Sequence, residues 1–436
     1  MLLALLDSWI ESITQWKGTT CSCTAAPVAW SPTITITSPA NSATVSGVFT
    51  IAGWTQIHHT WGTASAAITA SFAFGVNSVI RNEGLTAFPV TNGFNTATIE
   101  VIIKNSSSTG SSGSTMNAFA NFWGVNTHMA YPISVPSDNP VTPGAMLSRL
   151  LAMNVKMVRA DIAGPGPASI LAAAIVGFAS AGIKVQPVFQ VISNGWNPET
   201  QNESQAYAIG YSMAQACCSK LSASGITHYE CGNELDAWKD ATSLGFKIAG
   251  NGSNDTDWRQ SYWPAYRGVA RGMIQGVHDF DSTLLCGFGQ GVPMAYRAME
   301  MLWDGVEPNS SSGHPTVRWD YTCYHWYHSY GNIRLGAGTA DILSKLYVKF
   351  AKPIWLTEVG FNGGEGDTST SASASVYMRG ALSQYYSLRV QFQIESIQWY
   401  TLHDSSYGLI SADGTTLNAS YTTYKDYISA HQSLSA

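Results

Sequence analysis

The two stretches YECGNELD (Tyr229 to Asp236) and KPIWLTEVGFN (Lys352 to Asn362) decide how this chain is interpreted. Each starts as an apolar, strand-like run and carries a carboxylate, Glu234 or Glu358, where the run gives way to a loop. The two carboxylates are far apart in the sequence, so only a closed fold can make them neighbours. A barrel of parallel strands does this, because it collects the ends of all its strands on one face.

Strand-like runs alternate with helical stretches through residues 120–436. Segments such as 145–154 and 168–182 have apolar residues at intervals of three and four, which is typical of helices that cover a sheet. The runs expected to be strands lie at 121–128, 155–162, 183–190, 228–234, 283–289, 320–327, 353–360 and 396–404. Repeated βα units with continuously apolar strands predict a (β/α)8 TIM barrel whose parallel sheet is covered on both faces.

Residues 31–104 have a different pattern, of short alternating runs separated by Pro, Gly and Asn, which predicts a small all-β antiparallel domain. Residues 105–119 begin with NSSSTGSSGST, which is too polar and too rich in Gly and Ser to fold alone, so we interpret them as a linker. For residues 1–30 we expect a short amphipathic helix rather than a secretory signal, because Asp7 and Glu11 interrupt the apolar run. No stretch is long enough to predict a membrane span.

Composition excludes several classes of function. The 436 residues are 45% hydrophobic, enough for a large core, and only 11% charged, against about a quarter in typical domains. A net charge of −6 and the absence of Lys/Arg clusters argue against a nucleic-acid partner. The seven cysteines have no CxxC pair and no zinc spacing, so no metal or cofactor is expected, and Cys231, Cys286 and Cys323 are predicted to fill the core.

Polar side chains stand at the ends of several predicted strands, where a barrel carries its catalytic groups. Cleavage of an acetal needs one carboxylic acid to protonate the departing oxygen and one carboxylate on the other side of the sugar ring. Glu234 and Glu358 supply this pair, so the sequence indicates glycosidase chemistry. The accompanying groups at strand ends are Arg159, Asn233, His325, Tyr327 and Trp399.

These residues resemble the motifs of glycoside hydrolase clan A, the retaining (α/β)8 glycosidases that include families 5 and 39. The resemblance covers about residues 120–430 and implies that Glu234 is the acid/base and Glu358 the nucleophile. It implies that Arg159, Asn233, His325 and Tyr327 support the nucleophile and the transition state, and that Trp399 floors a sugar subsite. The fourth strand reads GNELD where many clan members have NEP, so neither the exact family nor the sugar carries over.

The segment TITITSPANSATVSGVFTIAGW, residues 33–54, resembles the opening of immunoglobulin-like modules of bacterial extracellular enzymes. The resemblance covers about seventy residues and implies that 31–104 is an immunoglobulin-like sandwich preceding the barrel. It also leads us to expect a secreted, periplasmic or cell-surface bacterial protein, although the N-terminus has no clear signal peptide.

The proposed roles carry physical expectations. Glu358 has to be ionised to attack the anomeric carbon, which the Arg159 guanidinium and the Tyr327 hydroxyl would favour. Glu234 has to keep a proton, so we expect burial and the charge of Glu358 to raise its pKa. Arg159 is also expected to pair with Glu230, a deeper residue that points the same way as Glu234. Asn233 is expected to bind the sugar 2-hydroxyl, and further sugar contacts are expected from Asn126, His128, Gln190, Asp236, Trp238 and Trp326.

The sequence thus predicts a monomeric retaining hydrolase that cleaves β-glycosidic bonds of a polysaccharide or oligosaccharide. An endo mode on an exopolysaccharide or cell-wall glycan is favoured, because aromatic residues fall in several predicted rim loops. Two alternatives stay open. One is a carbohydrate-binding or adhesion protein with little activity, and the other is a transglycosylase, which would use the same residues.

Overall fold

The structure is a computed structural model of the chain. It describes residues 119–131, 140–239, 245–361 and 368–431, without the side chains of 368–373, together with the backbone of six strands between residues 47 and 103. The chain divides into two units, residues 1–113 and 114–436, and each is described by itself.

The first unit contains antiparallel strand pairs. Strand β1 (Gly47–Ile57) pairs along its whole length with β6 (Gly93–Ile103). Two shorter antiparallel pairs are β2 (Ala64–Ala66) with β5 (Phe88–Val90), and β3 (Ala73–Phe74) with β4 (Ser78–Val79). The predicted immunoglobulin-like sandwich and the predicted helix within residues 1–30 fall largely outside the described residues, so both stay predictions.

The second unit is a closed barrel of eight parallel strands in the order β10-β11-β12-β13-β14-β7-β8-β9. All eight predicted strands are confirmed. Their continuous burial, as in the fully buried β13, reflects a sheet covered on both faces. The strands are β7 (Trp123–Thr127), β8 (Met157–Ile162), β9 (Lys184–Phe189), β10 (His228–Glu230), β11 (Leu285–Gln290), β12 (Tyr321–Tyr327), β13 (Ile354–Gly360) and β14 (Ile394–Trp399).

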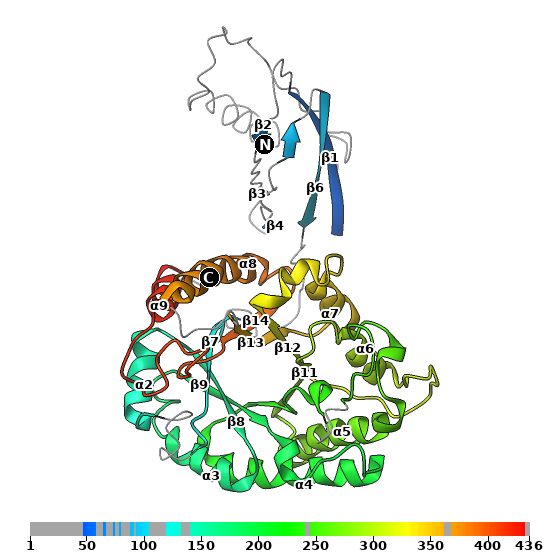
Figure 1. Ribbon diagram of the computed structural model, residues 1–436, viewed down its shortest axis with the longest axis vertical. Coiled ribbons are helices and arrows are strands. Elements are labelled where there is room, and N and C mark those ends of the chain that lie inside the picture. Colours follow the sequence, from blue (N-terminus) through cyan, green and yellow to red (C-terminus); the bar gives the residue numbers. More distant parts are fainter. Residues whose placement is uncertain are drawn as a thin grey trace. The chain divides into compact units, whose positions relative to one another are not determined.

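Helices form a ring around these strands (Figure 1). Helix α4 (Glu203–Leu221) begins at a capping box: the Asn202 side-chain oxygen accepts a hydrogen bond from the Gln205 backbone amide, and the Gln205 side-chain oxygen accepts one from the Asn202 backbone amide. No described helix is both long and apolar enough to span a bilayer. The helices are α2 (Pro143–Ala152), α3 (Pro165–Ala174), α4 (Glu203–Leu221), α5 (Trp263–Phe280), α6 (Tyr296–Asp304), α7 (Ile342–Phe350), α8 (Thr368–Leu388) and α9 (Ala419–Ala430).

Helices α4 and α5 approach each other closely along a stripe of glycines on α5. A Cβ atom added to Gly268 or Gly272 would lie 2.2 Å from a backbone carbonyl oxygen of α4, that of Glu203 or Tyr207. A Cβ atom on Gly276 would lie 2.7 Å from the carbonyl oxygen of Tyr211. The spacing of four residues puts the three glycines on one face of α5, so the backbones pack without intervening side chains.

The barrel interior beneath the mouth mixes apolar packing with a chain of hydrogen bonds. Met157, Tyr321, Cys323 and Trp355 form a buried cluster there. The Gln398 amide donates to Gln186 at 2.6 Å, and Gln186 donates to the Tyr321 hydroxyl at 3.0 Å. The three cysteines predicted to fill the core, Cys231, Cys286 and Cys323, are all fully buried, as predicted.

Candidate active site

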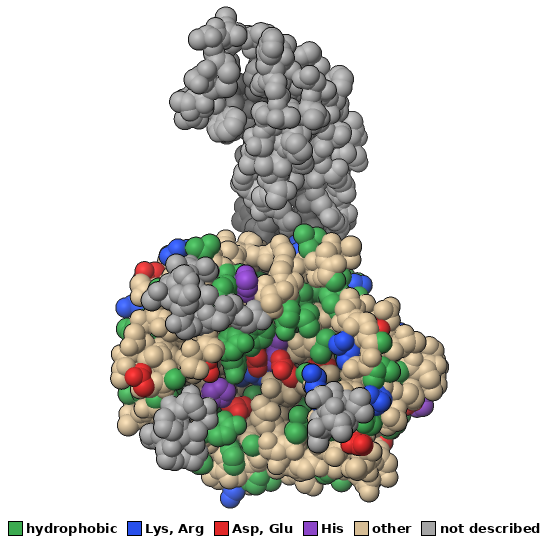
Figure 2. All heavy atoms as spheres, viewed as in Figure 1, with side chains coloured by type: hydrophobic (Ala, Val, Ile, Leu, Met, Phe, Trp, Pro, Cys, Tyr) green, Lys and Arg blue, Asp and Glu red, His purple; other side chains and the backbone are tan. Residues whose placement is uncertain are grey.

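The carboxyl ends of β8, β10, β12 and β13 bring the predicted catalytic groups together. A register shift between Tyr324 and His325 in the β12–β13 pair sets His325 opposite Glu358. Glu234 follows β10 and reaches the same cluster through His325. In the space-filling view, acidic and histidine side chains gather in a hollow over the middle of the barrel (Figure 2).

Glu358 is buried and held by two donors. The Arg159 Nη1 donates to its Oε1 at 2.6 Å, and the Tyr327 hydroxyl donates to its Oε2 at 2.6 Å. Both contacts were predicted from the sequence. Each carboxylate oxygen of Glu358 thus has a strong donor. Because Glu358 is only 5% exposed, the Arg159 guanidinium, rather than water, compensates its negative charge.

Arg159 connects the site to the barrel interior. Its Nε donates to Glu230 at 2.6 Å, confirming the predicted partner, and its other nitrogens reach Asn126 at 2.9 Å and Asn233 at 2.6 Å. Burial acts against the cation, but the charges of Glu230 and Glu358 outweigh it and raise the pKa of Arg159. A buried guanidinium with every edge bonded is therefore a fixed positive charge and a rigid support for its neighbours.

Glu234 has a left-handed backbone, with φ of 45° and ψ of 40°, which is strained for a residue with a side chain. Its Oε1 lies 2.8 Å from Nδ1 of His325. One carboxylate oxygen of Glu234 and one of Glu358 lie within 4.8 Å of each other. The loop thus turns Glu234 back toward Glu358.

The predicted pKa of Glu234 is wrong in direction. Burial by itself raises this pKa, but the hydrogen bond and the charge of His325 more than offset burial and lower it. The expectation of a raised pKa treated Glu358 as the charge nearest to Glu234. In the fold, the protonated ring of His325 contacts Glu234 directly, and its effect on the pKa of Glu234 is larger than that of the more distant Glu358 carboxylate.

His325 lies among three carboxylates. Its Nδ1 is 2.8 Å from Glu234 and 3.5 Å from Glu358, and its Nε2 is 3.8 Å from Glu230. Burial lowers the pKa of His325, but Glu358, Glu230 and Glu234 outweigh it and raise the pKa to about 10. The ring is therefore protonated at neutral pH and holds a proton next to Glu234.

Gly291 makes room for the Glu234 carboxyl group. A Cβ atom at Gly291 would lie 2.4 Å from Cδ of Glu234. The Gly291 amide donates to Asp236 at 2.9 Å, and the Val292 amide donates to the same carboxylate at 2.7 Å. Asp236 is fully buried, and burial raises its pKa to about 6. The structure therefore places Asp236 as an anchor for the loop after β11 and not in reach of a sugar, which corrects its predicted role.

The three tryptophans predicted to contact sugar are buried. Trp399 is 1% exposed and packs against Tyr424 and Tyr377, on the helix side of β14. Trp326 is 1% exposed and donates to the Gly331 carbonyl, and Trp238 is 8% exposed and packs against Trp196 and Tyr262. Their predicted roles as sugar contacts do not fit these positions.

Tyr400, one residue after Trp399, stands at the mouth instead. It is half-buried, and its ring centroid is 6.2 Å from that of Tyr327 and 5.7 Å from that of Tyr407. Burial and the negative charge of Glu358 raise the pKa of Tyr400, so the Tyr400 hydroxyl lies close enough to Glu358 to interact with it electrostatically. Alternation along a strand explains the one-residue error, since neighbouring side chains face opposite sides of a sheet.

A second polar group flanks the mouth at the ends of β7 and β8. Asp161, which the sequence analysis did not single out, accepts from Nδ1 of His128 at 2.8 Å and from the Tyr131 hydroxyl at 2.7 Å. Burial raises the pKa of Asp161, but the His128 bond outweighs it and the pKa is lowered. Asp161 lies two residues beyond Arg159 on β8, and that spacing on a strand ending at the mouth was a signal available in the sequence.

Asn126 and Gln190, also predicted to contact sugar, differ in position. Asn126 is 3% exposed and donates to the backbone carbonyls of Thr357 and Gln398 at 2.9 Å and 3.2 Å, so it positions Arg159 rather than reaching the surface. Gln190 is half-buried and follows the end of β9. His128 is likewise half-buried at the mouth.

Two groups of side chains among the described residues have the spacing of metal ligands. Glu234, His325 and Glu358 form one, and His278, Cys286 and Asp320 form the other. In the first group the ring nitrogen that would bind a metal is already bonded to Glu234, and the raised pKa of His325 keeps it protonated. An imidazole must lose its proton to ligate a metal, so this group suits proton transfer better.

Comparisons with known proteins bear on the family and the fold. Residues 309–424 match the family model described as "Glycosyl hydrolase catalytic core". The match includes His325, Tyr327 and Glu358 but stops short of Arg159 and Glu234. A search of curated proteins finds no match.

Several solved structures share the fold at low sequence identity. The GH1 beta-glucosidase from Exiguobacterium antarcticum B7 is 13% identical, with a TM-score of 0.51 over 72% of this chain and 98% of that one. A beta-glucosidase from Thermotoga maritima, solved with cyclophellitol, is 9% identical, with a TM-score of 0.52 over 73% and 98%. A beta-glucosidase from Exiguobacterium marinum is 14% identical, with a TM-score of 0.50 over 66% and 86%. The family match, the barrel and the paired carboxylates together support a glycoside hydrolase.

Proposed function

We propose that this protein is a retaining hydrolase of β-glycosidic bonds in a polysaccharide or oligosaccharide, with Glu358 as nucleophile and Glu234 as acid/base. The observation that carries the proposal is the separation of the two carboxylates, whose oxygen atoms approach within 4.8 Å. Retaining enzymes hold these groups about 5 to 5.5 Å apart, and inverting enzymes about 6.5 to 9.5 Å apart to fit a water molecule. The short separation favours direct attack by Glu358.

In the first step, a Glu358 oxygen bonds to the anomeric carbon as the bond from that carbon to the leaving oxygen breaks. Arg159 and Tyr327 hold the attacking carboxylate by one oxygen each. The leaving oxygen takes a proton from Glu234, which receives it from His325 across their 2.8 Å contact. Glu234 can therefore act as an acid although its own pKa is lowered, because the neighbouring His325 holds the proton that Glu234 passes on.

In the second step, Glu234 takes a proton from water, and the water oxygen displaces Glu358 from the anomeric carbon. A sugar hydroxyl in place of water would give transglycosylation from the same intermediate. Chromatography of the products at high acceptor concentration distinguishes the two: elongated sugars indicate transfer, and only shortened sugars indicate hydrolysis.

Half-buried tyrosines support a sugar-binding mouth. Tyr327, Tyr330, Tyr400 and Tyr407 have ring centroids about 5.7 to 6.2 Å apart from neighbour to neighbour. Their rings offer apolar faces and their hydroxyls offer hydrogen bonds, a combination suited to sugars. We extend the proposal to endo action on an exopolysaccharide or cell-wall glycan by a monomeric, secreted or cell-surface bacterial enzyme.

The test compares wild type with Glu358→Gln on aryl β-glycosides and on a panel of polysaccharides assayed for reducing ends. The variant keeps the shape of the side chain but removes the nucleophile, so turnover should fall to background. Asp426→Asn, at an exposed acid on helix α9, is the matched control and should keep full activity. NMR of the first product should show the β anomer.

Equal turnover by wild type and Glu358→Gln would refute the enzyme assignment. An α anomer as first product would refute retention while leaving hydrolysis intact. If wild type binds a polysaccharide of the panel but cleaves none, the carbohydrate-binding or adhesion alternative takes its place.

A further inference from the structure

A second cavity lies at the end of the barrel opposite the paired carboxylates. It has a volume of about 490 Å³ and is lined by residues of α4, α5 and α6 and by the segments that lead into β12 and β13. Asp320 and Lys352 stand just before the first residues of those strands, whereas His325 and Glu358 stand toward their other ends. Five residues of strand, roughly 16 Å, separate Asp320 from His325, so the cavity is distinct from the active site.

Four of the eleven residues that line the cavity are cationic, in a chain whose net charge is −6. Arg271, His278, Arg318 and Lys352 line it, against the single carboxylate of Asp320. Among the described residues, no carboxylate lies within ion-pair distance of Arg318 or Lys352. Charges of one sign gathered in a concave surface attract ligands of the other sign.

Arg318 is held in place without being neutralised. Its guanidinium carbon lies 4.3 Å from the ring centroid of Trp303, and Nη1 donates to the carbonyls of Trp303 and, at 3.0 Å, Val317. These partners carry no charge, so they orient the guanidinium and leave its positive charge available. Arg271 keeps one ion pair, 3.0 Å from Glu203.

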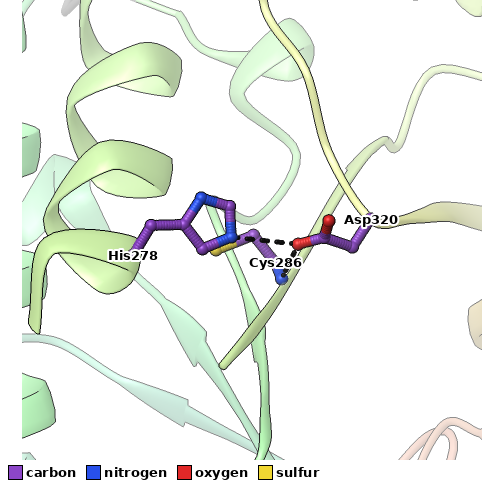
Figure 3. Close-up of side chains that lie close together, drawn as sticks. All are labelled: His278, Cys286 and Asp320. Carbon is purple, nitrogen blue, oxygen red and sulfur yellow. Dashed lines mark hydrogen bonds and ion pairs between the residues drawn. The ribbon is translucent and has the colours of Figure 1, made fainter. Parts of the chain in front are cut away.

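His278 and Asp320 form part of the wall, and the buried Cys286 lies next to both (Figure 3). Asp320 accepts from Nε2 of His278 at 3.0 Å and from the Cys286 amide at 2.8 Å. The hydrogen bond to Asp320, followed by the one to Cys286, raises the pKa of His278 to about 10, so the ring is a cation at neutral pH. The Asp320 carboxylate is therefore already bonded to His278 and to the Cys286 amide.

The spacing of these three residues also suits a metal ion, but their surroundings do not. The thiol of Cys286 is fully buried, and Nε2 of His278 already bonds to Asp320. Arg271, Arg318 and Lys352 would repel a divalent cation arriving through the cavity. The same charges favour an anion.

We propose that this cavity is a second binding site for a small anionic ligand, one that carries a carboxylate, sulfate or phosphate group. Its volume suits a small molecule, and its polar walls offer donors rather than acceptors. Arg318 can meet a carboxylate or phosphate through two parallel N–H groups, with Lys352 as a second point charge. An acidic sugar and a free inorganic anion share this chemistry.

The experiment titrates the full-length protein with glucuronate, with glucose as the uncharged match, and with inorganic phosphate, by isothermal calorimetry at low ionic strength. We expect glucuronate, phosphate or both to bind and glucose not to bind. Binding of glucuronate alone identifies an acidic sugar as the ligand, and binding of phosphate identifies a free anion.

Lys352→Gln and Arg318→Gln each remove one cation and should weaken anion binding about tenfold, the effect of losing one charged hydrogen bond. Lys352 has no ion pair to lose among the described residues, so its replacement should leave thermal stability intact. Lys349→Gln is the matched control, because Lys349 pairs with Asp304 at 2.6 Å and does not line the cavity. Hydrolytic activity should be unchanged in all three variants.

The site is refuted if neither anion binds, or if neither variant changes the affinity for the anion that binds. A sugar bound at the active site would give the same heat in wild type and in the two cavity variants, so the variants distinguish failure of this site from failure of the proposed hydrolase function.

Discussion

Glu234 has a strained backbone that its surroundings hold in place. A left-handed residue with a side chain costs roughly 1 to 3 kcal/mol, and such strain persists where contacts over-determine it. The Glu234 side chain is held by its hydrogen bond to His325, and it fits only because Gly291 has no side chain to occupy the same space. The position of the carboxylate therefore depends on a residue with no side chain.

Replacing Gly291 with alanine tests this dependence. The new methyl group would overlap the end of the Glu234 side chain, which is flexible enough to move away. We expect kcat to fall about 100-fold, since a displacement near 1 Å at a catalytic group has that effect, with little change in the midpoint of thermal unfolding. Gly144→Ala, where a Cβ atom meets nothing within 4 Å, should keep full activity.

The proton shared by Glu234 and His325 makes a prediction about pH. With its pKa raised to about 10, His325 keeps the pair singly protonated up to that pH, so the alkaline limb of kcat/KM should lie near pH 10. His325→Gln removes the group that holds this proton. The limb should then move several pH units toward acid, to the pKa of Glu234 alone, as measured from full pH profiles of kcat/KM. A limb that stays in place would show that His325 does not hold the catalytic proton.

At the scale of elements, the contact of α4 with α5 depends on missing side chains. Gly272→Ala would put a methyl group 2.2 Å from the Tyr207 carbonyl oxygen, and backbone atoms cannot move aside cheaply. We expect a loss of about 1 to 3 kcal/mol in unfolding free energy, measured by denaturant titration. A shift of α4 away from α5 would also disturb the ion pairs of Arg267 on α5, which bonds to Glu203 on α4 at 2.6 Å and to Glu307 at 2.7 Å.

Gly380→Ala is the opposite case on another helix. It lies on α8 with no atom within 4 Å of an added Cβ atom, so alanine should stabilise the protein by about 0.5 to 1 kcal/mol through the unfolded state. Equal effects at Gly272 and Gly380 would contradict close packing of α4 against α5.

At the scale of the whole molecule, every proposed catalytic residue belongs to the unit of residues 114–436. That unit also holds the described hydrophobic core. A protein of residues 114–436 should therefore cleave a small aryl β-glycoside with the kcat/KM of the full chain. A folded fragment that lacks this activity would show that residues 1–113 contribute to catalysis.

The barrel and its catalytic pair were predictable because both are local signals repeated along the chain. Each strand is an apolar run of nearly uniform burial, and parallel connection then gathers the strand ends on one face. The pairing of Arg159 with Glu230 followed from strand alternation, and the contacts of Glu358 with Arg159 and Tyr327 followed from the resemblance to clan A. The role predicted for Trp399 does not fit, because Trp399, the last residue of β14, faces the helices, and Tyr400, the residue after the strand, stands at the mouth.

The sequence by itself determined which elements form and which acids stand at their ends, since hydrophobic period and residue type are properties of short segments. Only the tertiary structure decided the protonation of Glu234, the burial of Asp236 and the cationic cavity below the barrel. The reason is physical: a charge responds to whatever lies within a few ångströms. For Glu234 that neighbour is His325, which is 91 positions away in the chain.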